Sequence, residues 1–402
     1  MSTVGILGAG AMGAGIAQTA ACAGWRVHLV DLDLDTCEAS KQGIITRLAR
    51  NVEKGRMSQT QADAAAERIA PSTTRDLHGC ELFIEAIVED LNIKVAAVTP
   101  VLDVLPEDAI IATNTSSLSV SEFGERIEAA PRTCGMHFFN PAAIMKLVEV
   151  VSGNRTEQRI VDRVADVATQ WGKKVARCAD TPGFIVNRVA RPYYLEAFRC
   201  LEDGIAGPPT IDSAMKLIGG FRMGPFELTD FIGHDVNAAT TRSVWKQWEC
   251  PARLAPVAAQ EAMVAEGNLG RKSGCGVYDW SGPQPVCVYR PTQDAATSVG
   301  GLDATALRFC EAATQNAEAL ADSTEQQRIV FTRILAALLN EAAWAAHQGV
   351  ADPADIDVAM RAGVNYPRGL FAWADDIGGD LVSETLARLN ESVDDNRFAA
   401  PS

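Results

Sequence analysis

Two ionisable side chains stand inside apolar, strand-like runs. His137 lies within residues 133–138, and Glu149 follows twelve positions later within residues 147–151. A charge removed from water needs a partner, and the turn at Asn140-Pro141 lets the two runs come together, so we expect Glu149 beside His137. A carboxylate on one imidazole nitrogen fixes the tautomer and leaves the other nitrogen to take a proton. Such a pair suits the oxidation of an alcohol, while spacing alone also allows a purely structural pair in a core.

A second pattern capable of chemistry is glycine-rich and lies near the amino terminus. The apolar run 4–7 leads into Gly8-Ala9-Gly10-Ala11-Met12-Gly13, after which an apolar helical pattern begins. In this setting the first glycine permits a tight turn, the second lets a pyrophosphate approach the backbone, and the third lets the helix lie close to the strand. The amino terminus of the helix then attracts the phosphates. The segment predicts a dinucleotide-binding site.

Asp31 refines the prediction of a dinucleotide site. It ends a second strand-like run, 26–30, and stands 18 residues after Gly13. A carboxylate at this place accepts hydrogen bonds from the ribose hydroxyls of the adenosine and repels a 2′-phosphate. The sequence therefore favours NAD over NADP as the cofactor.

The elements that must position these residues alternate between strands and helices. Further strand-like runs occur at 81–87, 109–113 and 146–151. This alternation predicts an α/β fold with a doubly wound, mostly parallel, Rossmann-type sheet over about residues 1–180. Because ligands bind at the carboxyl ends of such strands, the polar residues that follow them are candidates for the site: Glu89, Asn114, Ser116, Ser117, His137 and Asn140.

Composition limits the class of protein. The chain has 402 residues, 47% hydrophobic and 22% charged, which predicts a folded protein of two or three domains. A formal net charge of −15 argues against binding to nucleic acid. The long uncharged stretch 1–25 contains six glycines and predicts no membrane span. The ten cysteines are spaced singly, so they predict no metal site and are expected to stay reduced, as in a cytoplasmic protein.

Together these motifs resemble the L-3-hydroxyacyl-CoA dehydrogenase family. The similar segments run in family order from about residue 3 to 280. They are the glycine segment with Asp31, Glu85-Ala-Ile-Val-Glu89, Asn114-Thr-Ser-Ser-Leu118, His137-Phe-Phe-Asn-Pro141, Met145-Lys-Leu-Val-Glu149, Asp180-Thr-Pro-Gly-Phe-Ile-Val-Asn-Arg188, Met223-Gly-Pro-Phe-Glu-Leu228 and Gly270-Arg-Lys-Ser-Gly274. The resemblance implies an enzyme that reversibly oxidises (S)-3-hydroxyacyl-CoA to 3-oxoacyl-CoA with NAD, in β-oxidation-type metabolism of fatty or aromatic acids.

The resemblance also implies a role for each matching residue. His137 corresponds to the general base and Glu149 to its orienting partner, while Ser116 and Asn187 correspond to the pair that binds the substrate oxygen. Besides the glycine segment, Asp31 and Ser116, the implied cofactor contacts are Glu89, Lys94, Asn140 and Lys272. A dehydrogenase of a free hydroxy acid or sugar acid is the nearest alternative on this fold. A non-catalytic NAD-binding protein is an alternative from a different class.

A basic island supports a coenzyme A substrate. Residues 41–56 carry five basic side chains and one acidic one, a local balance of +4 in an acidic protein. Coenzyme A is a polyanion, and clustered Lys and Arg attract phosphates. Arg47 and Lys54 lie seven apart and so share a helical face; with Lys94 they are the expected coenzyme A contacts. A solvated helix face is the alternative for the island.

The second half of the chain contains an internal repeat. Residues on a helical pattern recur at a constant offset of 145 positions: Glu196-Ala197 as Glu341-Ala342, Gly204 as Gly349, Ile211-Asp212 as Ile356-Asp357, Ala214-Met215 as Ala359-Met360, Gly224 as Gly369, Phe226 as Phe371, Asp230 as Asp375 and Ile232-Gly233 as Ile377-Gly378. Such a repeat predicts two copies of one helical domain. We therefore expect an NAD-binding domain at 1–182, a helical substrate domain at 183–280, a linker at 281–324 and a second helical copy at 325–402.

The second copy is not expected to be a second active site, because Thr332 stands where the first copy has Asn187. In the family that the chain resembles, helical domains pack two-fold against each other between subunits. A tandem copy could take the partner's place within one chain and form a monomeric pseudo-dimer. A conventional homodimer is the alternative.

Overall fold

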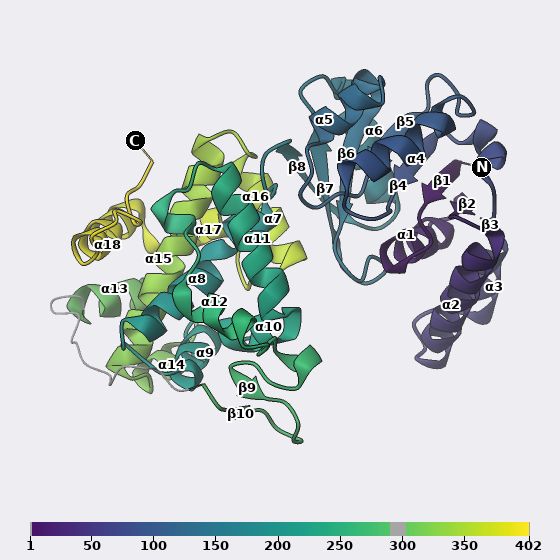
Figure 1. Ribbon diagram of the computed structural model, residues 1–402. Helices are drawn as coiled ribbons and strands as arrows, with labels where there is room; N and C mark the ends of the chain where they lie inside the picture. Colours follow the sequence, from purple (N-terminus) through teal and green to yellow (C-terminus); the bar gives the residue numbers. More distant parts are fainter. Residues whose placement is uncertain (1, 290–302, 402) are drawn as a thin grey trace. The chain divides into compact units, whose positions relative to one another are not determined.

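The computed structural model describes residues 2–289 and 303–401. The chain divides into two compact units, Met1–Phe184 and Ile185–Ser402, and each is described here by itself. Figure 1 colours the first unit purple to blue and the second teal to yellow. Part of the expected linker, 290–302, lies outside the described residues.

The first unit is built on an eight-stranded sheet in the order β3-β2-β1-β4-β5-β6-β7-β8. Its strands are β1 (Thr3–Leu7), β2 (Arg26–Val30), β3 (Ile69–Pro71), β4 (Leu82–Glu85), β5 (Ile110–Thr113), β6 (Thr133–Phe138), β7 (Leu147–Ser152) and β8 (Lys174–Ala179). Neighbours from β3 to β6 pair in parallel, β7 is antiparallel to β6, and β8 is parallel to β7. The predicted doubly wound, mostly parallel sheet is confirmed. The strand order reverses beside β1, which opens the ligand crevice at the carboxyl ends of β1 and β4.

Two strands of this sheet were not predicted. β3 has only three residues and ends in a proline, which makes it a weak strand signal. β8 lies at the sheet edge, and its exposed residues include Lys174 and Arg177, so it lacks the apolar run of a central strand.

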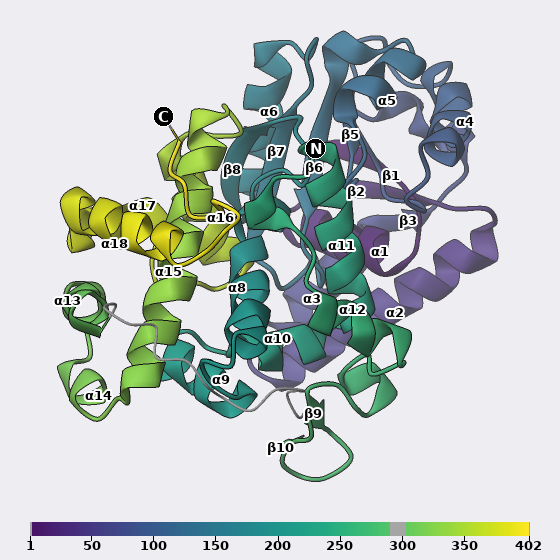
Figure 2. The same ribbon diagram turned by 60° about the vertical axis from the view of Figure 1, so that its left-hand side comes forward.

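Helices cover both faces of the sheet, as Figures 1 and 2 show. α1 (Ala11–Cys22) and α6 (Gln158–Gln170) contribute to one apolar core, while α4 (Leu91–Leu102) and α5 (Val120–Arg126) contribute to the other. α2 (Leu34–Glu53) and α3 (Gln59–Glu67) pack against each other. Asp33 caps α2 by accepting a hydrogen bond from the Thr36 N–H, and Ser58 with Gln61 forms a capping box on α3.

The second unit is helical apart from the short pair β9 (Tyr278–Asp279) and β10 (Val286–Cys287). Its first half contains α7 (Val186–Val189), α8 (Arg191–Glu202), α9 (Pro208–Leu217), α10 (Pro225–Ile232), α11 (His234–Gln247) and α12 (Ala258–Ala265). The second half contains α13 (Asp303–Ala313), α14 (Ala317–Ala321), α15 (Glu325–His347), α16 (Pro353–Gly363), α17 (Leu370–Ile377) and α18 (Gly379–Glu391). By length and composition α15 could cross a membrane, but 83% of its apolar window is buried and it packs against α8 and α9. It is the central core helix of this unit.

The constant offset seen in the sequence reappears in the helices. α10 and α17 begin and end 145 positions apart, and α9 and α16 begin 145 positions apart. The Asp212 carboxylate accepts a hydrogen bond from the Phe226 N–H at 2.8 Å, and Asp357 accepts one from the Phe371 N–H at the same distance. The repeated sequence therefore builds the same helix arrangement twice.

Buried charges join the two copies with an approximate two-fold symmetry. Arg188 donates to Glu341 at 2.7 Å and to Gln348 at 2.5 Å. At the positions 145 residues away, Arg333 donates to Glu196 at 2.9 Å and pairs with Asp203 at 2.7 Å. Each copy thus supplies the arginine of one pair and the carboxylate of the other, which is the pattern of an isologous contact.

Part of the segment assigned to the linker is folded. α13 and α14 lie within residues 303–324, and α13 packs on α15, α17 and α18. Ala306, Phe309, Cys310 and Ala313 are buried, and their spacing forms one helical stripe. The linker is therefore shorter than expected, and α13 extends the core of the second copy.

Candidate active site

The His137–Glu149 pair forms as the sequence predicts. The two residues stand directly opposite each other on the antiparallel strands β6 and β7. The His137 Nδ1 lies 2.7 Å from the Glu149 Oε2, and both side chains are buried. This geometry directs the Nδ1–H toward the carboxylate, which orients Nε2 as the nitrogen that accepts a proton.

The imidazole is held among aromatic rings and an ordered turn. The ring centroids of Phe139 and Phe184 lie 4.6 and 5.8 Å from that of His137. The Asn114 side chain accepts a hydrogen bond from the Phe138 N–H at 2.8 Å, which ties the end of β5 to the end of β6. These contacts fix the ring and limit the access of water to it.

Lys173 holds the loop between the two strands. Its ammonium donates to the carbonyls of Ala142 and Met145, at 2.5 and 2.8 Å. Burial lowers the pKa of Lys173 to about 8. The loop that joins the histidine strand to the glutamate strand is thereby anchored to the start of β8.

The glycine segment has the geometry of a phosphate cradle. Gly8 has a φ of 109°, and a Cβ on Gly13 would stand 1.8 Å from the Gly8 carbonyl oxygen, so neither position accepts a side chain. A Cβ on Gly10 would meet no protein atom within 4 Å. The backbone is therefore open at Gly10, at the amino terminus of α1, where a pyrophosphate fits.

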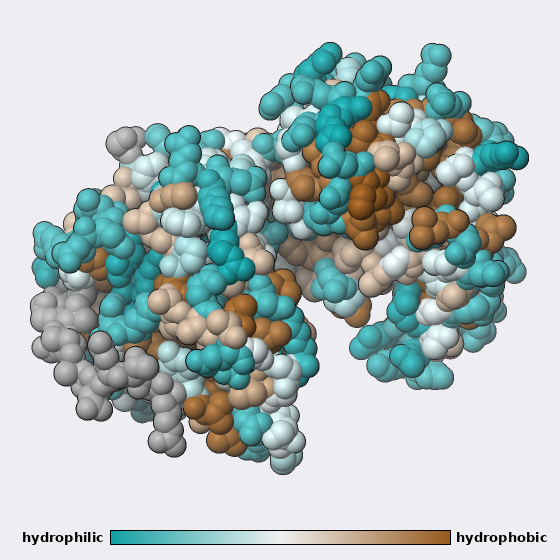
Figure 3. All heavy atoms as spheres, viewed as in Figure 1, coloured by the Kyte–Doolittle hydropathy of each residue, from teal (hydrophilic) through white to brown (hydrophobic). Residues whose placement is uncertain are grey.

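Asp31 lies beside this cradle. Its carboxylate accepts hydrogen bonds from the N–H groups of Ala9 at 2.5 Å and Leu32 at 2.7 Å. Leu32 and Val88, which follow β2 and β4, are 98% and 61% exposed. In Figure 3, brown marks the hydrophobic residues that reach the surface. These apolar side chains at the cradle were missed by the sequence analysis, although each is the residue next to a predicted polar contact.

Glu89 lies next to the serine segment, residues 115–117, which follows β5. Its Oε1 lies within hydrogen-bond distance of the Thr115 hydroxyl at 2.7 Å, of the Ser116 and Ser117 N–H groups at 2.8 and 3.1 Å, and of the Ser117 and Ser116 hydroxyls at 3.1 and 3.2 Å. Burial acts to raise the pKa of Glu89, but the Thr115 hydrogen bond, the charge of Lys94 and the serine contacts outweigh it and hold the pKa below its ordinary value. Ser116 and Glu89 are thus brought together as one structural group.

Lys94 occupies a different place from the one expected for a coenzyme A contact. Its side chain is buried in α4, and its ammonium lies 2.7 Å from Glu85 and 3.3 Å from Glu89. A buried ammonium between two carboxylates cannot extend to a solvent-exposed phosphate. This burial stands against the expected coenzyme A contact of Lys94, and nothing in the segment around Lys94 indicates that Glu85 pairs with its charge.

The remaining expected contacts lie on surfaces of both units. Asn140 precedes a cis peptide bond to Pro141, directly after β6. In the second unit, Asn187 lies in α7, and the Lys272 ammonium lies 2.7 Å from the Asp235 Oδ2 with both side chains partly exposed.

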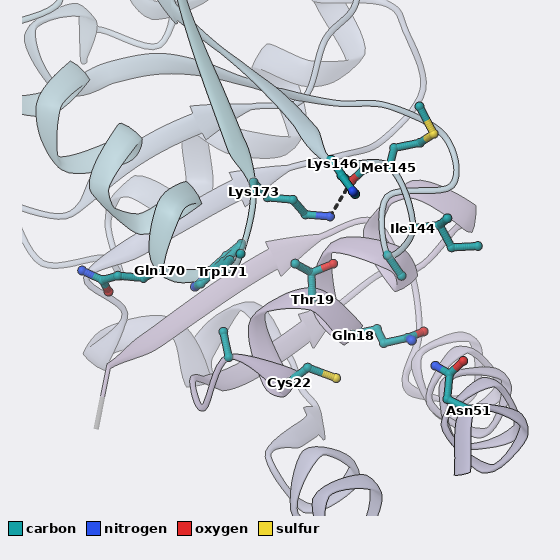
Figure 4. Close-up of a pocket in the computed structure, with 13 residues that line it drawn as sticks. Gln18, Thr19, Cys22, Asn51, Ile144, Met145, Lys146, Gln170, Trp171 and Lys173 are labelled. Atoms are coloured by element: carbon teal, nitrogen blue, oxygen red, sulfur yellow. Dashed lines mark hydrogen bonds between the residues drawn. The ribbon is translucent and has the colours of Figure 1, made fainter. Parts of the chain in front are cut away.

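The helix that carries most of the basic island, α2, contributes Asn51 to the lining of a cavity in the first unit. Arg47, in α2, donates to the Gln18 side chain of α1 at 2.9 Å, and Lys54 directly follows the end of α2. Gln18 and Asn51 line a cavity of about 420 Å³ together with the loop 143–146 and residues 170–173 (Figure 4). The lining contains two lysines, Lys146 and Lys173, and no acidic residue. In a chain with a net charge of −15, such a lining favours an anionic ligand.

Comparisons with known proteins identify the family of the chain. The family model for the 3-hydroxyacyl-CoA dehydrogenase NAD binding domain matches residues 3–181, and the model for the C-terminal domain matches residues 183–280 and 329–402. A 3-hydroxyadipyl-CoA dehydrogenase from Escherichia coli is 36% identical over 99% of this chain and 95% of its own length.

Solved structures give the same relationship. A crystal structure of 3-hydroxybutyryl-CoA dehydrogenase from Escherichia coli covers all of this chain and 97% of its own, with 36% identity and a TM-score of 0.88. An (S)-3-hydroxybutyryl-CoA dehydrogenase from Ralstonia eutropha covers 70% of this chain and 100% of its own, with 36% identity and a TM-score of 0.68. By its two domain matches and its likeness over the whole length, the chain belongs to the 3-hydroxyacyl-CoA dehydrogenase family.

Proposed function

We propose that the protein catalyses the reversible, NAD-dependent oxidation of (S)-3-hydroxyacyl-CoA to 3-oxoacyl-CoA. The observation that carries the proposal is the buried pair of His137 Nδ1 and Glu149 Oε2 at 2.7 Å, placed near the carboxyl end of β6 in the sheet whose first strand ends at the glycine cradle. The names of the relatives favour a coenzyme A thioester as substrate. They also favour metabolism of fatty or aromatic acids.

In the proposed reaction His137 accepts the proton of the substrate 3-hydroxyl on Nε2. Glu149 holds the ring in the reactive tautomer and stabilises the positive charge that the ring gains. Ser116 and Asn187 bind the substrate oxygen, and the rings of Phe139 and Phe184 shield the imidazole from water. When bound, NAD accepts the hydride that leaves C3 of the substrate.

The residues that would hold NAD fit the cofactor. The segment Gly8–Gly13 takes the pyrophosphate at the start of α1, Asp31 takes the ribose hydroxyls, and the exposed Leu32 and Val88 give the adenine an apolar surface. We assign the further cofactor contacts to Glu89, Asn140 and Lys272, while Lys94 contributes through Glu89.

We assign the phosphates of coenzyme A to Arg47 and Lys54. Arg47 is exposed and oriented by Gln18, and the cavity beside it has a cationic lining without acids. The same unit therefore supplies both the catalytic base and a surface for the charged end of the substrate.

We further propose that the two helical copies form a pseudo-dimer within one chain. The crossed pairs Arg188–Glu341 and Arg333–Glu196 support this, because they repeat one contact about an approximate two-fold axis. We expect a single active site per chain, since Thr332 replaces Asn187 and is buried with its hydroxyl directed to the Ala306 carbonyl of α13. A homodimer in sedimentation experiments would contradict the pseudo-dimer.

The ten cysteines are all free, five of them on the first unit, which fits the reducing conditions of a cytoplasm. We propose that location for the protein. Detection of the protein in a soluble cytosolic fraction of its source cells would test it.

The experiment that tests the function follows NADH absorbance with acetoacetyl-CoA and, in the reverse direction, with (S)-3-hydroxybutyryl-CoA. We expect turnover with both thioesters and little with free 3-hydroxybutyrate. Preferred turnover of the free acid would favour a hydroxy acid dehydrogenase, and binding of NAD without turnover of either substrate would favour a non-catalytic protein.

A further inference from the structure

A buried network of polar side chains lies beneath the serine segment, and the roles assigned above leave its members Glu85 and Thr113 unexplained. Glu85, at the end of β4, is fully buried. Its Oε1 accepts hydrogen bonds from the Lys94 ammonium and from the Ile87 N–H, both at 2.7 Å, and its Oε2 accepts one from the Thr113 hydroxyl at 2.6 Å. Each oxygen of Glu85 therefore has a donor, so the carboxylate is fixed in one orientation.

Lys94 connects this buried carboxylate to Glu89. Its ammonium lies 2.7 Å from the Glu85 Oε1 and 3.3 Å from the Glu89 Oε2, and it also donates to the Ile87 carbonyl at 3.4 Å. The side chain of Lys94 is 2% exposed, whereas that of Glu89 is 37% exposed. The ammonium thus ties a partly exposed carboxylate to a rigid, buried one.

The other oxygen of Glu89, Oε1, accepts the hydrogen bonds from the serine segment. Its five possible donors come from Thr115, Ser116 and Ser117, but one carboxylate oxygen offers about two lone-pair directions. These contacts therefore share the acceptor, and the longest of them, at 3.2 Å, is the Ser116 hydroxyl. The Ser116 hydroxyl thus shares this acceptor, while its backbone N–H is held more closely, at 2.8 Å.

We propose that Glu85, Thr113 and Lys94 are positioning residues for the reaction: they hold Glu89 in place so that Glu89 keeps the Ser116 segment in the geometry that receives the substrate oxygen. The proposal rests on the function proposed above, since Ser116 is the residue assigned there to the substrate. It gives Lys94 a role that needs no contact with substrate.

The charges that face Glu89 are consistent with this role. Lys94 comes from α4, Glu85 from β4, and the hydroxyls of Thr115, Ser116 and Ser117 from the segment after β5. Asp90, the neighbour of Glu89 in the chain, directs its carboxylate to the Ile93 N–H as the cap of α4. Lys94 is therefore the cation that favours the ionised form of Glu89, and an ionised carboxylate is the stronger acceptor for the serine N–H groups.

The test compares the single variant Lys94→Met with the double variant Lys94→Met/Glu85→Gln. The single variant leaves a buried carboxylate without its cation, so we expect a large loss of stability. The double variant removes both charges, so we expect its midpoint of denaturant unfolding to return near the wild-type value. If the network only stabilises the fold, the double variant will also regain wild-type kcat.

Positioning predicts a different result for the double variant. We expect kcat to stay reduced on the order of tenfold or more, because small displacements of a substrate-binding group are costly to catalysis. We also expect amide hydrogen exchange of the peptide containing Ser116 and Ser117 to become at least about tenfold faster, as the N–H groups lose their fixed acceptor. The exchange measurement needs no substrate. It therefore tests whether the network holds the Ser116 segment in place, even if the wild type proves inactive on acyl-CoA and the proposed function fails.

Arg132→Met is the matched control. The partly buried guanidinium of Arg132 donates to the carbonyls of Pro106 and Ala109, at the end of β5 opposite to Glu89. The substitution therefore removes a cation next to β5 without changing a contact of Glu89. We expect it to lower stability while kcat and exchange at Ser116 stay near wild type. Wild-type kcat and wild-type exchange in the double variant would overturn the proposal.

Discussion

Two buried glutamates in different units of the molecule have opposite kinds of partner. Glu149, on β7, lies against the imidazole of His137, whose charge depends on its protonation. Glu196, on α8, lies against three guanidinium groups, those of Arg199, Arg333 and Arg397. Burial acts to raise the pKa of Glu196, but the three arginines outweigh it and lower the pKa to about 2.

The difference separates chemistry from assembly. A guanidinium stays charged under all ordinary conditions, so the Glu196 cluster and its counterpart Arg188–Glu341 hold the helical copies together without exchanging protons. An imidazole can both accept and donate a proton, and the proposed reaction assigns that step to His137, with Glu149 as its partner. The same carboxylate chemistry thus serves two purposes, and the partner decides which.

The largest effect should come from His137→Gln. Glutamine cannot accept the substrate proton, and we expect kcat to fall on the order of a thousandfold. NAD affinity, measured by fluorescence titration, should stay near wild type because the cradle lies on β1 and α1. Near-normal turnover would mean that His137 has a structural role, like the arginines around Glu196, and would contradict the proposed difference between the two buried glutamates.

Removal of an assembly carboxylate should affect stability and leave the chemistry intact. Glu341→Ala leaves Arg188 and Arg253 without their buried acceptor, and we expect the free energy of unfolding to fall by about 3 kcal/mol. Glu384→Ala, which breaks a more exposed contact with Arg308, is the control and should cost less than about 1 kcal/mol. Equal losses in the two variants, measured by denaturant unfolding, would refute the structural role assigned to the buried seam.

A third carboxylate sharpens the comparison, because its proposed partner is a ligand. Asp31→Ala should weaken NAD binding about tenfold and narrow the discrimination against NADP, since the 2′-phosphate is no longer repelled. Dissociation constants for both nucleotides provide the measurement. Unchanged affinity for NAD would mean that Asp31 serves only the backbone N–H groups of Ala9 and Leu32.

A further prediction concerns acid stability. The folded pKa of Glu196, about 2, lies below the ordinary value of 4.5, so the carboxylate stabilises the fold above about pH 4.5 and this contribution is lost as the pH falls toward 2. We expect Glu196→Gln to flatten the decline of the unfolding free energy between pH 5 and 3. A slope identical to that of the wild type would show that other carboxylates account for the decline.

Local patterns were sufficient to predict the sheet and the contact between His137 and Glu149. The glycine segment, the apolar runs and the spacing from His137 to Glu149 are short-range signals, and the two strands bring those residues into register. The 145-residue offset likewise predicted the repeat of helices, and α10 and α17 repeat with the same bounds. Each of these signals is visible in the order of residues along the chain, without knowledge of how the chain packs.

Features that depend on long-range packing escaped prediction. Lys94 was expected to contact the cofactor and coenzyme A, and nothing in its own segment shows that it is buried against Glu85. The crossed pairs Arg188–Glu341 and Arg333–Glu196 join residues 153 and 137 positions apart, although the repeat relates the two arginines by its constant offset. α13 is a different case. The apolar spacing of Ala306, Phe309, Cys310 and Ala313 is present in the sequence, but the segment was assigned to the linker because of the composition of the residues before it.

Proton transfer to His137 is tested most directly by chemical rescue. In His137→Gly the base is absent and a space is left where the ring was, so turnover of (S)-3-hydroxybutyryl-CoA should be very low. We expect added imidazole to restore it in proportion to the concentration of the neutral form, up to saturation. Absence of rescue in a variant that still binds NAD and acyl-CoA normally, or fast turnover without imidazole, would contradict the role of His137 as the base.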